Sequence, residues 1–293
     1  CFPMYASFTG GGAGWGIYRR WVVDKVTVRD LVAGNRGSGG TTGDGVAPDI
    51  ITDYAYSAAG WRHDGTDWWV DTPGVDDVSW GQWRGYKTVT TTVGVGAVKT
   101  VSKQVFYQGM HGDKAASGTK TVTMTRGFIV TGEGYSGIIN DDDWLAGTVF
   151  ESYQMDGTSS TDFLTASRSY SRWTLLSLDS TITRTGFPDK ETRKWAITLQ
   201  HSALRDGGTG STSYKYTRSD TVVDTLGRVV RVHSSGFGDV TGDETCQRTI
   251  YIGGSTPPTT ASAGWMQLVA QSVSYPAQGT LPDQSSYAVN TGG

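Results

Sequence analysis

The stretch from Tyr214 to Val232 most constrains the fold, because its residue types indicate a strand, a polar turn and a second strand. Tyr214 and Tyr216 are two residues apart and therefore lie on the same face of an extended segment. Asp224 can hydrogen-bond to the backbone further along the turn, and Gly227 can adopt the positive φ that such turns require. One unit of this kind cannot bury its apolar side alone, so several units predict a sheet that grows strand by strand.

Similar strand signals recur along the whole chain. Glycine accounts for 41 of 293 residues and proline for only 8, a combination that indicates turns and bulges. The 11 tryptophans and 14 tyrosines argue against disorder. We therefore expect an all-β fold with an extended antiparallel sheet, in which 120–125 completes a meander with 80–93 and 99–107. The other expected strands are 21–30, 50–56, 147–153, 168–173, 194–199, 246–252 and 271–275.

Composition does not divide the chain. No proline-rich linker or charge run interrupts it, so we expect a lead-in region over residues 1–130 that continues without a clear linker into a degenerate repeat sheet over residues 131–293. The net charge of −3, with both signs interspersed, disfavours nucleic acid as a partner. The apolar runs are too short for a membrane-spanning helix.

The two cysteines, Cys1 and Cys246, allow at most one internal disulfide, and nothing in their spacing indicates that they meet. So few cysteines in a β-rich chain fit a bacterial exported or cytosolic protein better than a disulfide-stapled module. The first residues include no initiator methionine, which favours a processed product or a fragment of a larger protein.

The turn motif resembles the YD-repeat, or RHS, pattern, in which Tyr-x-Tyr, an aspartate turn and Gly-Arg recur along a chain. Residues 217–223 separate the tyrosines from the aspartate more widely than the compact form of the pattern does. The residues that match the pattern are Tyr214, Tyr216, Asp224, Gly227 and Arg228.

Other segments extend this resemblance to about residues 15–275. Segments 21–26, 53–56 and 83–89 are similar to the middle region of Tc-toxin B-type subunits, and segments 107–114 and 242–251 resemble pieces of actinobacterial RHS-repeat proteins. Only one unit is close to the full repeat, and no self-cleaving aspartyl signature follows it.

The resemblance implies a sheet that curls into part of a hollow shell. It implies a non-catalytic structural segment of a secreted or cell-surface bacterial protein, which encapsulates or presents another polypeptide. The implied partners are other segments of the same large polypeptide or an enclosed toxin domain.

A tryptophan-rich stretch supports a different function, a module that binds glycan or a cell-surface partner. Exposed indole rings can stack on sugars, although rings at regular strand spacing also pack within sheets. The tryptophans of this stretch are Trp61, Trp68, Trp69, Trp80 and Trp83.

No catalytic constellation is recognised, so we expect no enzyme, no cofactor and no metal. The acidic runs 141–143 and 238–244 lack the ligand spacing of calcium loops and are explained by solvated turns. A β-rich glycoside hydrolase stays as a second alternative, because the 28 acidic residues offer many carboxylate pairs of unknown separation. Zinc is disfavoured because the histidines are isolated from one another, at His63, His111, His201 and His233.

Overall fold

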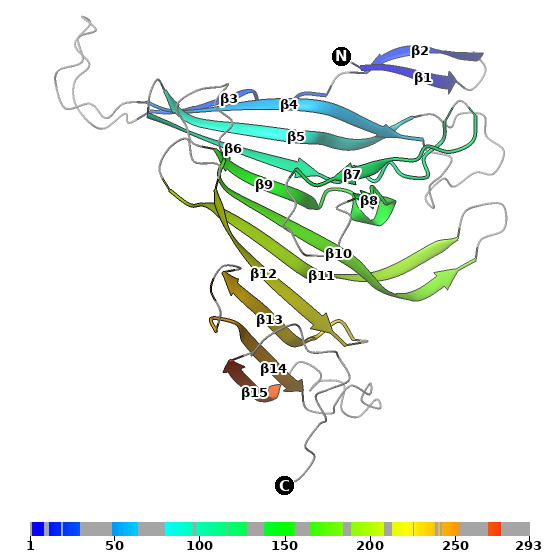
Figure 1. The fold of residues 1–293 in the computed structure, drawn as a ribbon. Coiled ribbons are helices and arrows are strands. Elements are labelled where there is room, and N and C mark those ends of the chain that lie inside the picture. Colours follow the sequence, from blue (N-terminus) through cyan, green and yellow to red (C-terminus); the bar gives the residue numbers. More distant parts are fainter. Residues whose placement is uncertain are drawn as a thin grey trace, which may run out of the picture. The chain divides into compact units, whose positions relative to one another are not determined.

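The computed structural model describes residues 2–8, 12–18, 20–29, 49–63, 80–95, 98–115, 117–127, 138–155, 165–183, 189–207, 213–224, 226–237, 240, 242–251 and 269–276. These residues are mostly β-strand (Figure 1), and the expectation of an all-β, antiparallel fold is confirmed. The one helical element within these ranges is a single 3-10 turn, η2 (Asp143–Leu145). No helix among the described residues is long and apolar enough to cross a membrane.

Eleven strands form one large antiparallel sheet in the order β15-β14-β13-β12-β11-β10-β9-β6-β5-β4-β3. Neighbours in this order are also neighbours in the sequence, except where β9 follows β6. The strands of this sheet are β3 (Lys25–Val28), β4 (Ile50–Arg62), β5 (Gln82–Val95), β6 (Val98–Phe106), β9 (Val149–Met155), β10 (Thr165–Ile182), β11 (Lys190–Arg205), β12 (Tyr214–Val223), β13 (Val229–Phe237), β14 (Thr245–Tyr251) and β15 (Val269–Pro276).

Two shorter antiparallel pairs complete the described strands. They are β1 (Phe2–Phe8) with β2 (Gly12–Tyr18), and β7 (Thr123–Thr125) with β8 (Ile138–Asn140).

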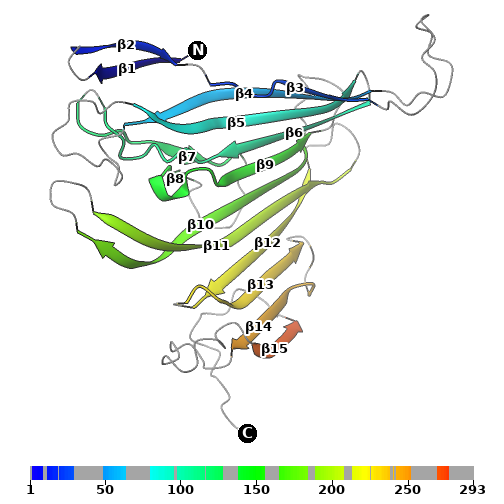
Figure 2. The same cartoon turned by 180° about the vertical axis from the view of Figure 1, so that it is seen from behind.

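The chain divides into two compact units, and the division falls within β10 and β11. Unit 1 comprises Cys1–Tyr170, Asp179–Thr192 and Gly207–Thr212, and unit 2 comprises the rest. In unit 1, β4, β5, β6 and β9 lie side by side, and in unit 2, β12, β13 and β14 do so, as both views show (Figures 1 and 2). The domain boundary expected near residue 130 falls in 128–137, outside the described residues.

The expected meander is wrong in its third strand. The hairpin of β5 and β6 forms as expected, but the strand that pairs with β6 is β9, whereas β7 pairs with β8 in a separate sheet. The chain leaves the sheet after β6 through a segment in which Gly109, Gly112 and Gly118 have positive φ angles of 71°, 74° and 73°. It returns so that Val149 lies opposite Phe106.

Buried apolar side chains are few among the described residues. In unit 1, the rings of Tyr107, Phe150 and Tyr170 form an edge-to-face series with centroids 5.1 and 5.4 Å apart. In unit 2, the buried set is Leu199, Ala203 and Cys246. Most strand residues are instead partly exposed, and all ten residues of β12 fall in this class although strands pair with β12 on both sides.

Candidate functional site

The predicted repeat turn closes the hairpin between β12 and β13. Asp224 Oδ1 accepts hydrogen bonds from the backbone N–H groups of Leu226 and Arg228, both at 2.9 Å. Its Oδ2 accepts from Arg228 Nε at 2.8 Å and lies 2.7 Å from Arg228 Nη2. Gly227 has a φ of 81°, so the glycine is required by the backbone as expected. The turn therefore brings Asp224, Gly227 and Arg228 together.

Both charged groups of this turn are buried. The side chains of Asp224 and Arg228 are 5% and 3% exposed. Burial by itself raises the pKa of Asp224, but the hydrogen bonds from Arg228 and Leu226 outweigh it and leave this pKa below its ordinary value. The Arg228 guanidinium also lies 4.5 Å from the centre of the Tyr251 ring, and the Tyr251 hydroxyl donates to Val229 O at 3.1 Å. The turn is thus tied to the next hairpin strand, β14.

The two motif tyrosines lie at the opposite end of β12 from the turn. Tyr214 and Tyr216 pair with Arg205 and Ala203 of β11, and their ring centroids are 6.3 Å apart. Residues 217–223, which widen the motif, are the remainder of this strand. The motif is therefore split between the two ends of one strand.

The tryptophan-rich stretch is only partly described. Trp61 and Trp83 are opposite each other on β4 and β5, with ring centroids 5.0 Å apart, and Trp83 also contacts Tyr86 at 5.1 Å. Trp80 contacts His63 at 4.8 Å. These contacts fit rings that pack in the sheet, and glycan binding stays a prediction. The remaining two tryptophans, Trp68 and Trp69, lie outside the described residues.

The acidic run 141–143 is not a solvated turn, because Asp141 is only 2% exposed. Its carboxylate accepts three backbone hydrogen bonds, from Gln108 and Gly109 at 2.8 Å and from Met110 at 3.1 Å. These donors begin the segment that leaves the sheet after β6, so Asp141 holds both ends of that segment together. The expectation was wrong because the partners of Asp141 are about thirty residues away in sequence.

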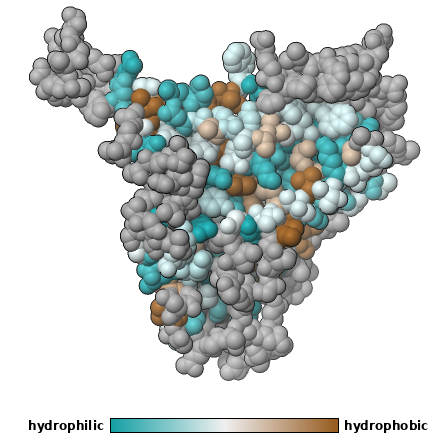
Figure 3. All heavy atoms as spheres, turned by 45° about the horizontal axis from the view of Figure 1, so that its top comes forward, coloured by the Kyte–Doolittle hydropathy of each residue, from teal (hydrophilic) through white to brown (hydrophobic). Residues whose placement is uncertain are grey.

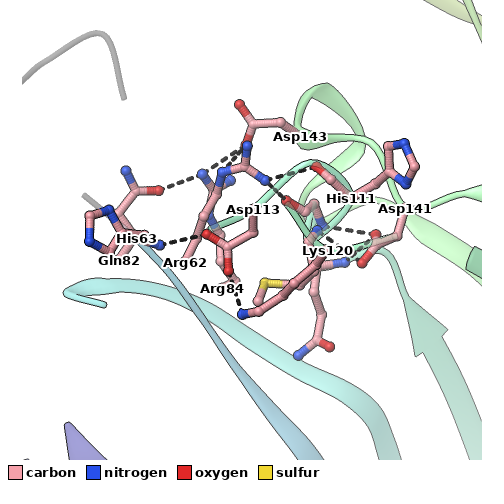
Figure 4. A network of polar contacts seen from close by, with 12 residues as sticks. Arg62, His63, Gln82, Arg84, His111, Asp113, Lys120, Asp141 and Asp143 are labelled. Atoms are coloured by element: carbon pink, nitrogen blue, oxygen red, sulfur yellow. Dashed lines mark hydrogen bonds and ion pairs between the residues drawn. The ribbon is translucent and has the colours of Figure 1, made fainter. Parts of the chain in front are cut away.

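Further polar contacts fix the same segment against the ends of β4 and β5, as Figure 4 shows. Asp113 is fully buried and accepts from His63 N at 2.9 Å and from Lys120 Nζ at 2.6 Å. Asp143 faces two guanidinium groups, with Oδ1 2.7 Å from Arg84 Nη2 and 3.8 Å from Arg62 Nε. We call the set the polar clamp, and its members are Arg62, Arg84, Gln108, Asp113, Asp141 and Asp143.

Gln108 gives the clamp a second role at an irregularity of β4. Ala58 has a positive φ of 52°, and the pairing register of β4 shifts between Ala59 and Trp61. The side-chain amide of Gln108 donates to Ala58 O at 2.8 Å and to Gly85 O at 2.9 Å. The clamp therefore binds backbone carbonyl groups of both β4 and β5 beside this irregularity.

One buried carboxylate lies outside both the turn and the clamp. Glu151 accepts hydrogen bonds from Gly127 N at 2.9 and 3.1 Å and from the Tyr153 hydroxyl. Burial raises the pKa of Glu151, although the hydrogen bonds and the charges of Arg126 and Lys103 oppose the change. Burial, followed by Glu151 itself, also raises the pKa of Tyr153. The charged groups acting on Glu151 are cations, whereas glycoside hydrolysis uses a second carboxylate.

The described histidines do not combine into a metal site. No cluster of three or more His, Cys, Asp or Glu that could hold a metal occurs within the described part of the chain. Cys246 is a free, buried cysteine opposite His233, and Cys1 lies outside the described residues.

Comparisons with known proteins found structural similarity of low degree only. No family model matches the chain, and no curated protein matches it either. Among solved structures, the crystal structure of TcdB2-TccC3 without its hypervariable C-terminal region is similar, with a TM-score of 0.47 and 12% identity. The match covers 78% of this chain and 12% of that chain, so this chain spans a small part of that protein. A similarity at this level does not show a shared fold, and membership of the RHS family stays a proposal.

Proposed function

We propose that this chain is a non-catalytic structural segment, a β-sheet wall that encloses or presents another polypeptide. The proposal includes the RHS type of repeat, export from a bacterial cell, and the larger polypeptide or an enclosed toxin domain as partner. The resemblance of the Tyr214-to-Arg228 motif is the reason for these finer assignments.

The exposure of β12 carries the proposal. This strand is interior to the sheet, because β11 and β13 pair with its two edges. A sheet in a globular domain normally buries at least one face against a second layer. Each of the ten residues of β12 is nevertheless partly exposed, whichever face it occupies. Such a strand suits a wall that meets another polypeptide better than it suits the interior of a closed domain.

The hairpin order and the surface chemistry agree with this role. From β9 to β15, each strand pairs with the next one in the sequence, which is how a wall extends by added hairpins. On the face shown in Figure 3, described residues of hydrophilic and hydrophobic type are interspersed, as expected for a surface in contact with a polypeptide chain and water.

Protease protection in the full product of the gene tests the proposal. We expect a segment outside residues 1–293 to resist trypsin while the sheet is intact, and to be cleaved when Asp224→Ala or the milder Gly227→Ala weakens the β12–β13 turn. Mass spectrometry of the digests locates the cleaved sites. Asp220→Ala is the control, because Asp220 lies on the same strand and pairs with the partly exposed Arg218. Cleavage of all flanking segments at equal rates in the native protein and the variants would refute the enclosing role.

A further inference from the structure

Two arginines in unit 2 lie directly opposite each other on neighbouring strands. Arg231 of β13 pairs with Arg248 of β14, and the same row continues to Val222 of β12 and Val273 of β15. Residues opposite each other in an antiparallel ladder project from the same face, with Cβ atoms about 5 Å apart. Two positive charges are therefore held side by side on one face of the sheet.

Within the described part of the chain, no carboxylate forms an ion pair with this arginine pair, Arg231 and Arg248. Like charges at directly opposite positions destabilise a sheet. Elsewhere in unit 2, Arg218 binds Asp220 through two hydrogen bonds of 2.6 and 2.8 Å, and Arg228 binds Asp224. Among the described residues, neither member of the pair forms an ion pair or a side-chain hydrogen bond. Both residues are partly exposed and so remain accessible.

A second polar side chain, His233, lies near the arginine pair on β13. His233 lies between Asp220 and Cys246 in register, two residues from Arg231. Its side chain is 5% exposed, and neither ring nitrogen has a hydrogen-bond partner among the described atoms. Burial lowers the pKa of His233, and Arg231 and Arg218 lower it further against the opposing effect of Asp220. The ring is therefore neutral at pH 7 and offers one donor and one acceptor.

We propose that this face of unit 2 binds an acidic segment of another polypeptide, with a carboxylate held between Arg231 and Arg248. Guanidinium groups bind carboxylates through paired, charge-assisted hydrogen bonds, which remove the repulsion within the pair. The inference rests on the proposed function and names the chemistry of the partner that the wall would contact.

The row of paired residues that contains Arg231 and Arg248 suits a polypeptide better than a nucleic acid. Two arginines flanked by Val222 and Val273 match one or two carboxylates beside apolar side chains. A duplex presents a phosphate about every 1.7 Å along its axis and is bound by extended basic surfaces. The whole chain instead carries a net charge of −3.

Binding of a labelled hexaglutamate peptide to the 293-residue chain tests the inference by fluorescence anisotropy. Arg231→Gln and Arg248→Gln should each weaken binding about tenfold, the value of one charge-assisted hydrogen bond. Lys215→Gln is the matched control, because it removes one positive charge from the other face of β12 and should leave binding unchanged. Equal weakening by all three variants, or equal binding of a hexaglutamine peptide, would overturn the proposal. Binding of a dT oligonucleotide with the same dependence on both arginines would overturn the assignment to a polypeptide.

Thermal unfolding separates a binding role from a structural one. Removing one of two repelling charges should keep or raise the unfolding midpoint of the free Arg248→Gln protein, and the acidic peptide should raise the midpoint of the wild type more than that of this variant. A lower midpoint with unchanged peptide binding would show that the arginines serve the fold and would contradict the inference. Protease protection without peptide binding would defeat this inference alone and leave the proposed function standing.

Discussion

Two aspartate–arginine pairs of similar geometry lie in very different surroundings. Asp224 and Arg228 are almost fully buried, whereas the side chains of Arg218 and Asp220 are 28% and 22% exposed. Removing one partner of a buried pair leaves an uncompensated charge and costs about 3 kcal/mol or more, while an exposed pair contributes less than about 1 kcal/mol. We expect Asp224→Ala to lower the free energy of unfolding by about 3 kcal/mol and Asp220→Ala by under about 1 kcal/mol. Urea unfolding of both variants measures the difference, and equal losses would contradict it.

The lowered pKa of Asp224 predicts how stability depends on pH. Because the carboxylate is stabilised in the folded protein, its contribution is present above the unfolded pKa of about 3.9 and is lost as the pH falls through the lower folded value. The unfolding midpoint of the wild type should therefore exceed that of Asp224→Asn at pH 7, and the gap should narrow below about pH 4. Calorimetry of both proteins from pH 3 to 7 measures the gap. A gap that stays constant would argue against the ionised turn.

The contribution of Glu151 to stability should depend on pH in the opposite direction from that of Asp224, since burial raises the pKa of Glu151. Its contribution is fully present below the unfolded pKa of about 4.3 and is lost as the pH rises through the raised folded value. Relative to Glu151→Gln, the wild type should therefore be most stable near pH 4 and lose that advantage toward pH 7. The same calorimetric series measures this trend, and an advantage that grows with pH would disprove it.

At the scale of elements, the segment between β6 and β9 depends on one carboxylate. Asp141 accepts three backbone N–H groups at residues 108–110, so its loss should free those amides. We expect Asp141→Asn to speed hydrogen exchange at 108–110 by at least about tenfold, because a neutral acceptor binds more weakly than a charged one. Asp142→Asn is the control, since Asp142 is next in sequence and half-buried. Similar exchange in both variants would show that Asp141 is not the anchor.

The hairpins were predictable, and the polar clamp was not. The turn at 224–228 carries its own chemistry, because an aspartate, a glycine and an arginine within five residues satisfy one another locally. The three glycines at 109, 112 and 118 were the available sign that the chain leaves the sheet. The contacts of the polar clamp could not be predicted from the sequence, because Arg62 and Asp141 bind segments 30 to 50 residues away.

At the scale of the whole molecule, few residues of the described strands are fully buried. β12 has no buried residue, and β3 is exposed along its length. Unfolding should therefore expose less new surface than in a compact protein of 293 residues, and the urea m value scales with that surface. We expect an m value clearly below that of globular proteins of the same length. Equilibrium unfolding followed by circular dichroism measures it, and a value in the ordinary range would contradict the partial exposure of these strands.

The sequence by itself determined that the chain is all-β and that hairpins follow one another, because turn residues and strand residues act over a few positions. It also indicated the backbone hydrogen bonds of Asp224 and the positive φ of Gly227 in the turn. Only the tertiary structure decided which strand pairs with β6, which carboxylates are buried and that Arg231 lies opposite Arg248. Those features depend on register between distant segments, and register is fixed by the whole ladder of strands. The Tyr214-to-Arg228 motif thus specifies one hairpin, whereas the strands that pair with this hairpin are determined by the register of the whole sheet.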